Sequence, residues 1–96
     1  MLDRAAAKAL VSKQLMERSP ADDLWVVVDE NTIERPFGWV FFYNSEKFLA
    51  SGETMYRLAG NGPVIVNKRT GAIEFFGSLQ TVEVVVANYE SRLGGE

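Results

Sequence analysis

Residues 58–77 constrain the possible folds of this chain more than any other stretch. Two apolar runs of strand length, residues 64–66 and 72–76, are separated by a polar segment that ends in Gly71. β-Branched and aromatic residues favour strands, and a short polar connection containing glycine is typical of a hairpin. Because glycine adopts positive φ without steric cost, we expect a type I turn followed by a left-handed residue at Gly71. The stretch therefore predicts a stiff β-hairpin, which by itself indicates no chemistry.

Two more strands are expected upstream of this hairpin. Residues 24–29 form a predominantly apolar run, which is typical of a strand covered on both faces. A polar turn at residues 30–32 leads into a longer run, residues 33–44, and these two strands would pair as a second hairpin. Pro36 and Gly38 interrupt the longer run, and we interpret them as a bulge or an edge position.

Helices are predicted at both ends of the chain. Residues 3–18 are rich in strong helix formers, and the helix ends before Pro20 because the residue preceding a proline avoids helical backbone. Residues 79–93 repeat apolar side chains with the helical period, and Gly94-Gly95 then ends the second helix. The apolar face of the first helix is expected to consist of Leu2, Ala5, Ala6, Ala9, Leu10 and Met16, with Val11 and Leu15 off this face.

These elements predict an α+β fold in a single domain over residues 1–96. Apolar residues make up 47% of the chain and charged residues 24%, which suits a globular protein with one hydrophobic core. Short connections favour pairing between consecutive strands, so we expect a four-stranded antiparallel meander built from two hairpins. The N- and C-terminal helices are expected to pack on one face of this sheet. Residues 44–52 should add one or two helical turns between the hairpins.

Composition excludes several kinds of chemistry. The chain has no cysteine and no histidine, which removes disulfides, thiolate metal sites and the side chain best suited to moving protons near neutral pH. Its carboxylates fall in no motif that fixes a distance between two of them, and the acidic turn at residues 29–32 lacks the length of a calcium loop. Gly60-Asn61-Gly62 is a weak phosphate signal because no helix begins after it. We therefore expect no catalytic residue, no metal site and no cofactor.

Charge and hydropathy also limit the expected partners. The net charge of −3 repels phosphate backbones, so nucleic acid is not an expected partner. The N-terminus lacks the basic-then-apolar order of a signal peptide, and no apolar run approaches the length that spans a bilayer. We therefore expect a cytoplasmic protein that does not engage a membrane.

A strand with alternating aromatic residues is the most conspicuous candidate for a partner-binding surface. Trp39, Phe41 and Tyr43 share one face of their strand. Such residues either pack beneath a helix or remain exposed and anchor a partner, since tryptophan and tyrosine are enriched at binding hot spots. The loop before the β-hairpin and the hairpin tip are further candidates. The expected partner-binding residues are Trp39, Phe41, Tyr43, Asn61, Lys68 and Arg69.

Four blocks of the sequence follow one another with the spacing of a known family. They are Gly38-Trp39, then Ser45-x-x-Phe48-Leu49-x-Ser51-Gly52-Glu53, then Leu58-Ala59-Gly60-Asn61-Gly62-Pro63-Val64-Ile65-Val66-Asn67-Lys68-x-Thr70-Gly71-x-Ile73, and finally Tyr89-Glu90. Through these blocks the chain resembles the YrhB-like or immunity protein 35 family from about residue 38 to 90, and the third block is the most specific. Relatives often have proline at the start of the last helix, where this chain has Thr81, a change that should leave the fold intact.

The resemblance implies a non-catalytic α+β domain that neutralises a cognate bacterial toxin by binding it. Members of this family are commonly encoded beside polymorphic toxins. Other members look like stand-alone small proteins with a proposed chaperone-like role, which is the alternative function. A third alternative, small-molecule binding or catalysis, would need a concave pocket with convergent polar groups. The sequence leaves open which toxin is bound and whether the protein forms a homodimer.

Overall fold

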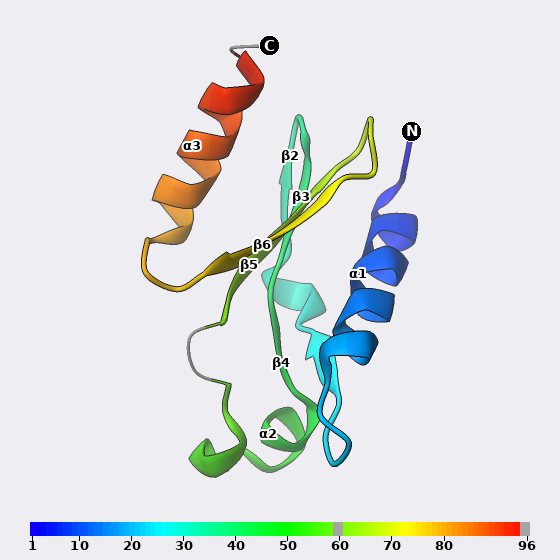
Figure 1. The fold of residues 1–96 in the computed structure, drawn as a ribbon, viewed down its shortest axis with the longest axis vertical. Helices are drawn as coiled ribbons and strands as arrows, with labels where there is room; N and C mark the ends of the chain where they lie inside the picture. The colour runs from blue at the N-terminus through cyan, green and yellow to red at the C-terminus, as the bar shows by residue number, and fades with distance from the viewer. Residues whose placement is uncertain (59–60, 95–96) are drawn as a thin grey trace.

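The computed structural model describes residues 1–58 and 61–94, and its helices and antiparallel strands confirm the α+β class (Figure 1). The helices are α1 (Arg4–Arg18), α2 (Glu46–Ser51) and α3 (Val82–Gly94), with the 3₁₀ turns η1 (Asp29–Asn31) and η2 (Thr54–Tyr56). The strands are β1 (Trp25–Val27), β2 (Ile33–Arg35), β3 (Gly38–Phe41), β4 (Tyr43–Ser45), β5 (Asn61–Asn67) and β6 (Ile73–Gly77). Gly60 and Gly95, which the sequence assigned to a loop and to a helix end, lie outside the described residues.

The strands form a four-stranded sheet in the order β2-β3-β5-β6 and a two-stranded sheet of β1 and β4. All neighbouring strands are antiparallel, and the larger sheet follows chain order as a meander does. The first hairpin, however, turns at Pro36-Phe37, because Arg35 pairs with Gly38, and residues 30–32 are not its turn. Proline presets φ in a turn, and the φ of 150° at Gly38 is one that glycine adopts without strain.

The polar segment near residues 30–32 interrupts a long ribbon. Val27 pairs with Tyr43, and Ile33 pairs with Val40, so β1 and β2 run beside β4 and β3 in one continuous direction. The turn η1 takes up the additional residues between β1 and β2. Residues 30–32 were therefore correctly predicted to form a turn, but this turn does not connect the two strands of a hairpin.

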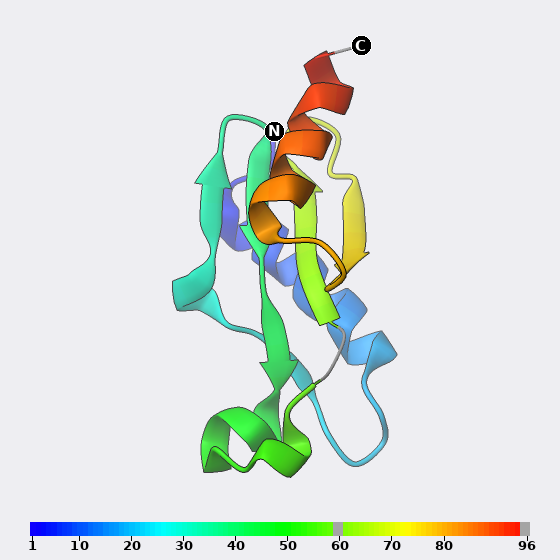
Figure 2. The ribbon, with the colours of Figure 1, turned by 90° about the vertical axis from the view of Figure 1, so that its left-hand side faces the viewer.

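The two long helices cover opposite faces of the four-stranded sheet, which corrects the expectation that both pack on one face (Figure 2). Trp39, Phe41 and Val66 lie in the core against α1, whereas Val40 and Ile65 lie in the core against α3. Because side chains alternate along a strand, the consecutive apolar residues of β3 and β5 make both faces of the sheet apolar. Each face therefore needs its own helix.

The buried side of α1 differs from the expected one. Ala7, Val11 and Leu15 are fully buried, whereas Met16 is 64% exposed and Leu10 is also exposed. The three buried residues are spaced four apart and form one row along the helix. The alanines of the expected face remove little apolar area from water, so the larger Val11 and Leu15 side chains decide how the helix is oriented.

The buried side of α3 is the predicted stripe. Val85, Val86 and Tyr89 are buried against the sheet. The helix begins at Val82, so Leu79 precedes it and is fully exposed, at 101%. The helical period thus predicted the packing face correctly but extended it one turn too far.

Candidate partner-binding surface

The six expected partner-binding residues fall in three separate places. Trp39 is 5% exposed and Phe41 is 0% exposed, and both lie in the core beneath α1. Their burial agrees with the reading in which the aromatic residues pack under a helix. In this fold neither side chain is presented to a partner. Of the other four residues, Arg69 is exposed, and Tyr43, Asn61 and Lys68 are half-buried.

Tyr43 and Asn61 are brought together at the start of β5. The Asn61 side-chain amide donates a hydrogen bond to the Tyr43 carbonyl oxygen at 2.8 Å. The Tyr43 ring is half-buried, stacked on Trp25 with 5.9 Å between ring centroids and edge-on to Phe75 at 6.1 Å. Burial raises the pKa of the Tyr43 hydroxyl above its ordinary value, and the nearby Arg18 charge opposes that rise. Through its contacts with Trp25 and Phe75, Tyr43 thus connects the two-stranded sheet to the four-stranded sheet.

A cleft of about 380 Å³ lies beside these two residues. Its polar groups already serve the fold: the Asn44 carbonyl oxygen Oδ1 accepts from the amides of Ser45 (2.8 Å) and Leu58 (3.1 Å). Among the described residues lining it, Arg57 is the charged one. The lining residues are Val28, Asn31, Phe42, Tyr43, Asn44, Arg57, Leu58, Asn61, Gly62, Pro63, Ser78, Gln80, Thr81 and Val82. Asn44 and Asn61 therefore use their side chains to hold the surrounding backbone.

Lys68 and Arg69 lie at the turn between β5 and β6, next to a hollow of about 620 Å³. The Lys68 amide donates to the Phe37 carbonyl at 2.9 Å, and the Lys68 carbonyl accepts from the Leu2 amide at 3.0 Å. These bonds tie the hairpin tip to the β2–β3 turn and to the N-terminal segment, while the Arg69 side chain stays exposed. We define the tip surface as Pro36, Phe37, Asn67, Lys68, Arg69, Thr70 and Leu93.

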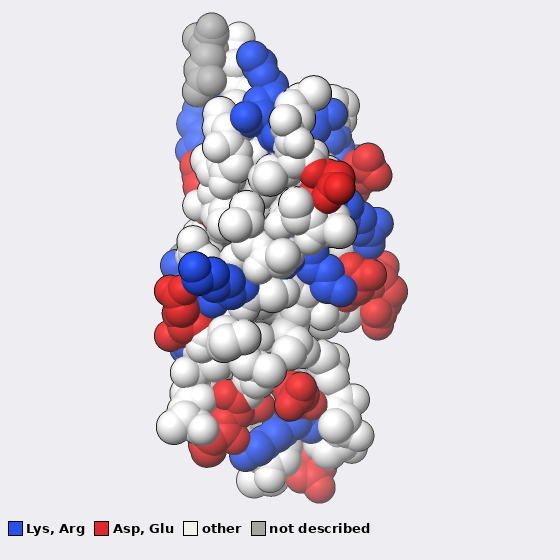
Figure 3. Space-filling model, turned by 90° about the vertical axis from the view of Figure 1, so that its right-hand side faces the viewer, with Lys and Arg blue, Asp and Glu red and all other residues white. Residues whose placement is uncertain are grey.

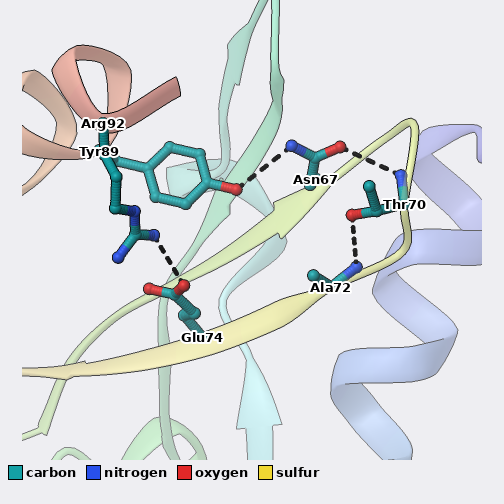
Figure 4. Close-up of polar contacts among 6 residues, drawn as sticks. All are labelled: Asn67, Thr70, Ala72, Glu74, Tyr89 and Arg92. Carbon is teal, nitrogen blue, oxygen red and sulfur yellow. Dashed lines mark hydrogen bonds and ion pairs between the residues drawn. The ribbon is translucent and has the colours of Figure 1, made fainter. Parts of the chain in front are cut away.

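Asn67 fixes the conformation of this tip. Its side-chain oxygen accepts from the Arg69 amide at 2.9 Å and from the Thr70 amide at 3.1 Å. Its side-chain nitrogen donates to the Tyr89 hydroxyl of α3 at 3.4 Å (Figure 4). Gly71 has φ of 75°, which confirms the predicted left-handed residue after the turn. A buried asparagine therefore holds both the turn and the adjacent helix.

Two more contacts hold β6 in place beside the tip. The Thr70 hydroxyl accepts from the Ala72 amide at 3.1 Å, which closes the end of the turn. The Arg92 guanidinium of α3 donates to the Glu74 carboxylate of β6 at 2.7 Å (Figure 4). The tip surface is thus preorganised, which lowers the entropic cost of binding a partner.

Charge is distributed unevenly between the two ends of the molecule. On the face that Figure 3 shows, basic side chains predominate near the upper end, where the β5–β6 turn lies, and acidic side chains gather at the lower end around α2. Arg35 and Arg69 are exposed at the tip end, and Asp22, Glu46 and Glu53 are exposed at the α2 end. On this face the end at the β5–β6 turn is therefore more basic than the end at α2, where Lys47 lies among the acidic side chains.

Sequence reasoning missed the free edge of β6 and the exposed side chain that follows it. β6 is the last strand of the four-stranded sheet, and Leu79 projects into solvent two residues after it. The helical period had placed Leu79 on a buried stripe. The strand order that leaves β6 at an edge depends on the whole fold, so no local signal in the sequence reports it.

Residues 1–58 and 61–94 contain neither a membrane-spanning helix nor a metal-binding cluster. No helix in those ranges has the length and apolar character needed to cross a bilayer. Within the same part of the chain, no three acidic, histidine or cysteine side chains gather closely enough to hold a metal ion.

This small α+β scaffold can be placed among known proteins by comparison. The family described as Immunity protein 35 matches residues 4–91, so the chain belongs to the immunity protein 35 family. A relative from Escherichia coli (strain K12), named "Uncharacterized protein YrhB", is 38% identical over 53 residues. That stretch covers 55% of this chain and 56% of the relative, so the match spans about half of each protein. No solved structure matches this chain.

Proposed function

We propose that this protein is a non-catalytic immunity protein that neutralises a cognate bacterial toxin in the cytoplasm by stoichiometric binding. The observation that carries this proposal is the match of residues 4–91 to the immunity protein 35 family. The absence of histidine and cysteine from the sequence supports binding over turnover. Neutralisation of this kind needs no cofactor, nucleic acid or membrane, because covering the toxin is sufficient.

We place the toxin contact at the tip surface. It is hollowed, it carries Lys68 and Arg69, and the hydrogen bonds of Asn67 hold it in one conformation. A preorganised surface loses little conformational entropy on binding, and exposed charges at its rim speed the encounter with an oppositely charged partner. The tip therefore suits an acidic patch on the toxin.

Co-expression with the product of the neighbouring gene tests the function. We expect the two proteins to co-purify in a fixed ratio and the toxicity of the neighbouring product to be suppressed. Absence of a complex together with unrelieved toxicity would refute the immunity function.

Charge reversal tests the location of the contact. Lys68→Glu combined with Arg69→Glu should weaken toxin binding at least about tenfold, mainly by slowing association. Lys13→Glu, which changes an exposed charge on α1, is the matched control and should leave binding within about twofold. If Glu46→Lys at the acidic end weakens binding while the tip variant does not, the contact lies at the opposite end of the molecule.

A chaperone-like role is the alternative, and exposed apolar side chains favour it. Leu79, Met16 and Met55 are all well exposed, and exposed apolar groups are what a chaperone presents to an unfolded client. Suppression of the aggregation of a heat-unfolded client, lost in the Leu79→Ser variant, would support this role. A protein inert in that assay does not have it.

A further inference from the structure

The hollow in the tip surface lies where three parts of the chain meet at one end of the molecule (Figure 1). They are the turn between β2 and β3, the turn between β5 and β6, and the last turn of α3. The volume of the hollow is about 620 Å³, within the range of about 300–1,000 Å³ that is typical of ligand pockets. It is therefore large enough to receive a side chain of a binding partner.

Apolar side chains form part of the lining of this hollow. Phe37 is 9% exposed, and its ring centroid lies 4.8 Å from that of Tyr89. Phe37 is held in place, because Tyr89 is itself buried and accepts a hydrogen bond from Asn67. Leu93 is half-buried and packs against the same core cluster. An apolar side chain that enters the hollow therefore meets a preorganised apolar surface, and its burial there removes apolar area from water.

A cation lies at the rim of the same hollow. Among the described lining residues Arg69 is the charged one, and it is exposed. Its backbone amide donates to the Asn67 side chain at 2.9 Å, whereas none of the ion pairs within residues 1–58 and 61–94 includes its guanidinium. A guanidinium presents its N–H donors in a planar fork that matches a carboxylate. The hollow thus combines an apolar surface with a cation that can bind an acidic group.

This combination favours one class of occupant. The Asn67 side chain is committed to the turn and to Tyr89, so a ligand rich in hydroxyl groups gains little from it. The net charge of −3 disfavours a nucleic acid. A protein segment that carries an apolar side chain next to an acidic one uses both the apolar lining and Arg69.

We propose that the toxin inserts an apolar side chain into the tip hollow and places the carboxylate of a neighbouring residue against Arg69. This inference rests on the proposed function and names the part of the toxin that the tip binds. The apolar side chain packs on Phe37 and Leu93, and the carboxylate accepts hydrogen bonds from the guanidinium. An anchor side chain that fills a pocket commonly supplies much of the binding energy at a protein interface.

The two halves of this contact affect different rate constants. Exposed charges speed the encounter, so Arg69→Gln should slow association and make it less sensitive to salt. An apolar anchor acts after the encounter, so blocking the hollow should speed dissociation and leave association nearly unchanged. This difference separates an occupied hollow from a surface that contributes charge alone.

Binding kinetics with the product of the neighbouring gene test the inference. Thr70 lines the hollow and is exposed, so Thr70→Trp fills the hollow without changing the charge of the tip. We expect dissociation to become at least about tenfold faster and association to stay within about twofold. Thr54→Trp, at an exposed threonine of η2 at the opposite end of the molecule, is the matched control and should leave both rate constants within about twofold.

Leu93→Ala provides a second variant, because Thr70 also accepts a hydrogen bond from the Ala72 amide and its replacement alters the turn. Removing this apolar wall should speed dissociation at least about threefold.

The outcomes separate this inference from the proposed function. Failure of the unmodified protein to form a complex overturns both. A complex whose dissociation is unchanged in both Thr70→Trp and Leu93→Ala overturns the inference alone, and the immunity function stands. Self-association of the unmodified protein that Thr70→Trp abolishes would show that a second copy occupies the hollow, which also overturns the inference.

Discussion

The two edge strands of the four-stranded sheet differ in length and in charge. β2 is short, its exposed residues are charged, and the preceding turn η1 is tied to α1 by Arg4 and Lys8, which lie 3.6 and 3.5 Å from the Asp29 carboxylate. β6 is longer, almost apolar and open along its backbone. Natural sheets usually blunt both edges to prevent unwanted pairing. A chain that protects one edge and leaves the other open has a surface suited to a specific partner.

Gly38, on the inner strand β3 where it turns back from β2, and Gly77, on the edge strand β6, provide the largest expected difference. A Cβ atom at Gly38 would lie 1.9 Å from the Val66 carbonyl oxygen, and its φ is 150°. At Gly77 a Cβ atom would meet nothing within 4 Å. Gly38→Ala should therefore lower the free energy of unfolding by about 3 kcal/mol through backbone strain and displacement of β5. Gly77→Ala should change it by less than about 0.5 kcal/mol. Urea unfolding measures both, and equal losses would show that the β2 side is not the tightly packed one.

Asn67 holds the turn that connects β5 to the edge strand β6. Asn67→Ala removes two hydrogen bonds within the turn and the contact with Tyr89, and should lower the free energy of unfolding by about 2 kcal/mol. Tyr89→Phe removes the last contact alone and should cost about 1 kcal/mol or less. Thermal unfolding of both variants separates the two contributions. If the two losses are the same, the turn does not depend on Asn67.

A charged residue on β6, like the exposed Glu34 and Arg35 of β2, should make the two edge strands more alike. Gly77→Lys places a charge on the open edge at an exposed position with free space. We expect the free energy of unfolding to change by less than about 0.5 kcal/mol. Urea unfolding tests this. A larger loss would show that position 77 is not open to solvent.

Acid should destabilise the two-stranded sheet through Asp23. The Asp23 carboxylate accepts hydrogen bonds from the Ser45 hydroxyl and the Leu24 amide, and the Ser45 bond chiefly lowers the pKa of Asp23 below 3.8. Because the folded-state pKa is lowered, this stabilisation is complete above pH 3.8 and is lost as pH falls through the folded-state pKa. Asp23→Asn should therefore lower the melting temperature at neutral pH and reduce its further fall in acid. An unaltered acid response in Asp23→Asn would contradict the assignment.

Local chemistry made the β5–β6 hairpin predictable from the sequence. The position of Gly71 specifies the turn, and the runs of β-branched and aromatic residues on either side specify the strands. The first ribbon was harder because two turn signals compete within it. Residues 30–32 were taken as the hairpin turn, whereas Pro36 marks the actual one. The pairing of Ile33 with Val40 decides between the two turns, and this pairing depends on the tertiary structure.

The positions of the helices were difficult to predict for a related reason. The apolar run of residues 24–29 was interpreted as a strand covered on both faces, and residues 64–66 only as one strand of a hairpin. The short connections favoured a simpler arrangement with both helices on one face. Among the expected surface residues, Lys68 and Arg69 were predictable because turns are solvated. Trp39 and Phe41 are aromatic, so their role depended on whether a helix covered them, and α1 does.

Amide hydrogen exchange at the two sheet edges tests the central claim most directly. The Lys68 amide bonds to the Phe37 carbonyl, so by alternation the backbone groups of Gly38 face β2 and those of Glu34 face away from the sheet. The Ile73 and Phe75 amides face outward at the other edge. We predict that the Ile73, Phe75 and Glu34 amides exchange faster than the Glu74 amide, which faces β5. Protection at Ile73 or Phe75 equal to that at Glu74 would contradict an open β6 edge.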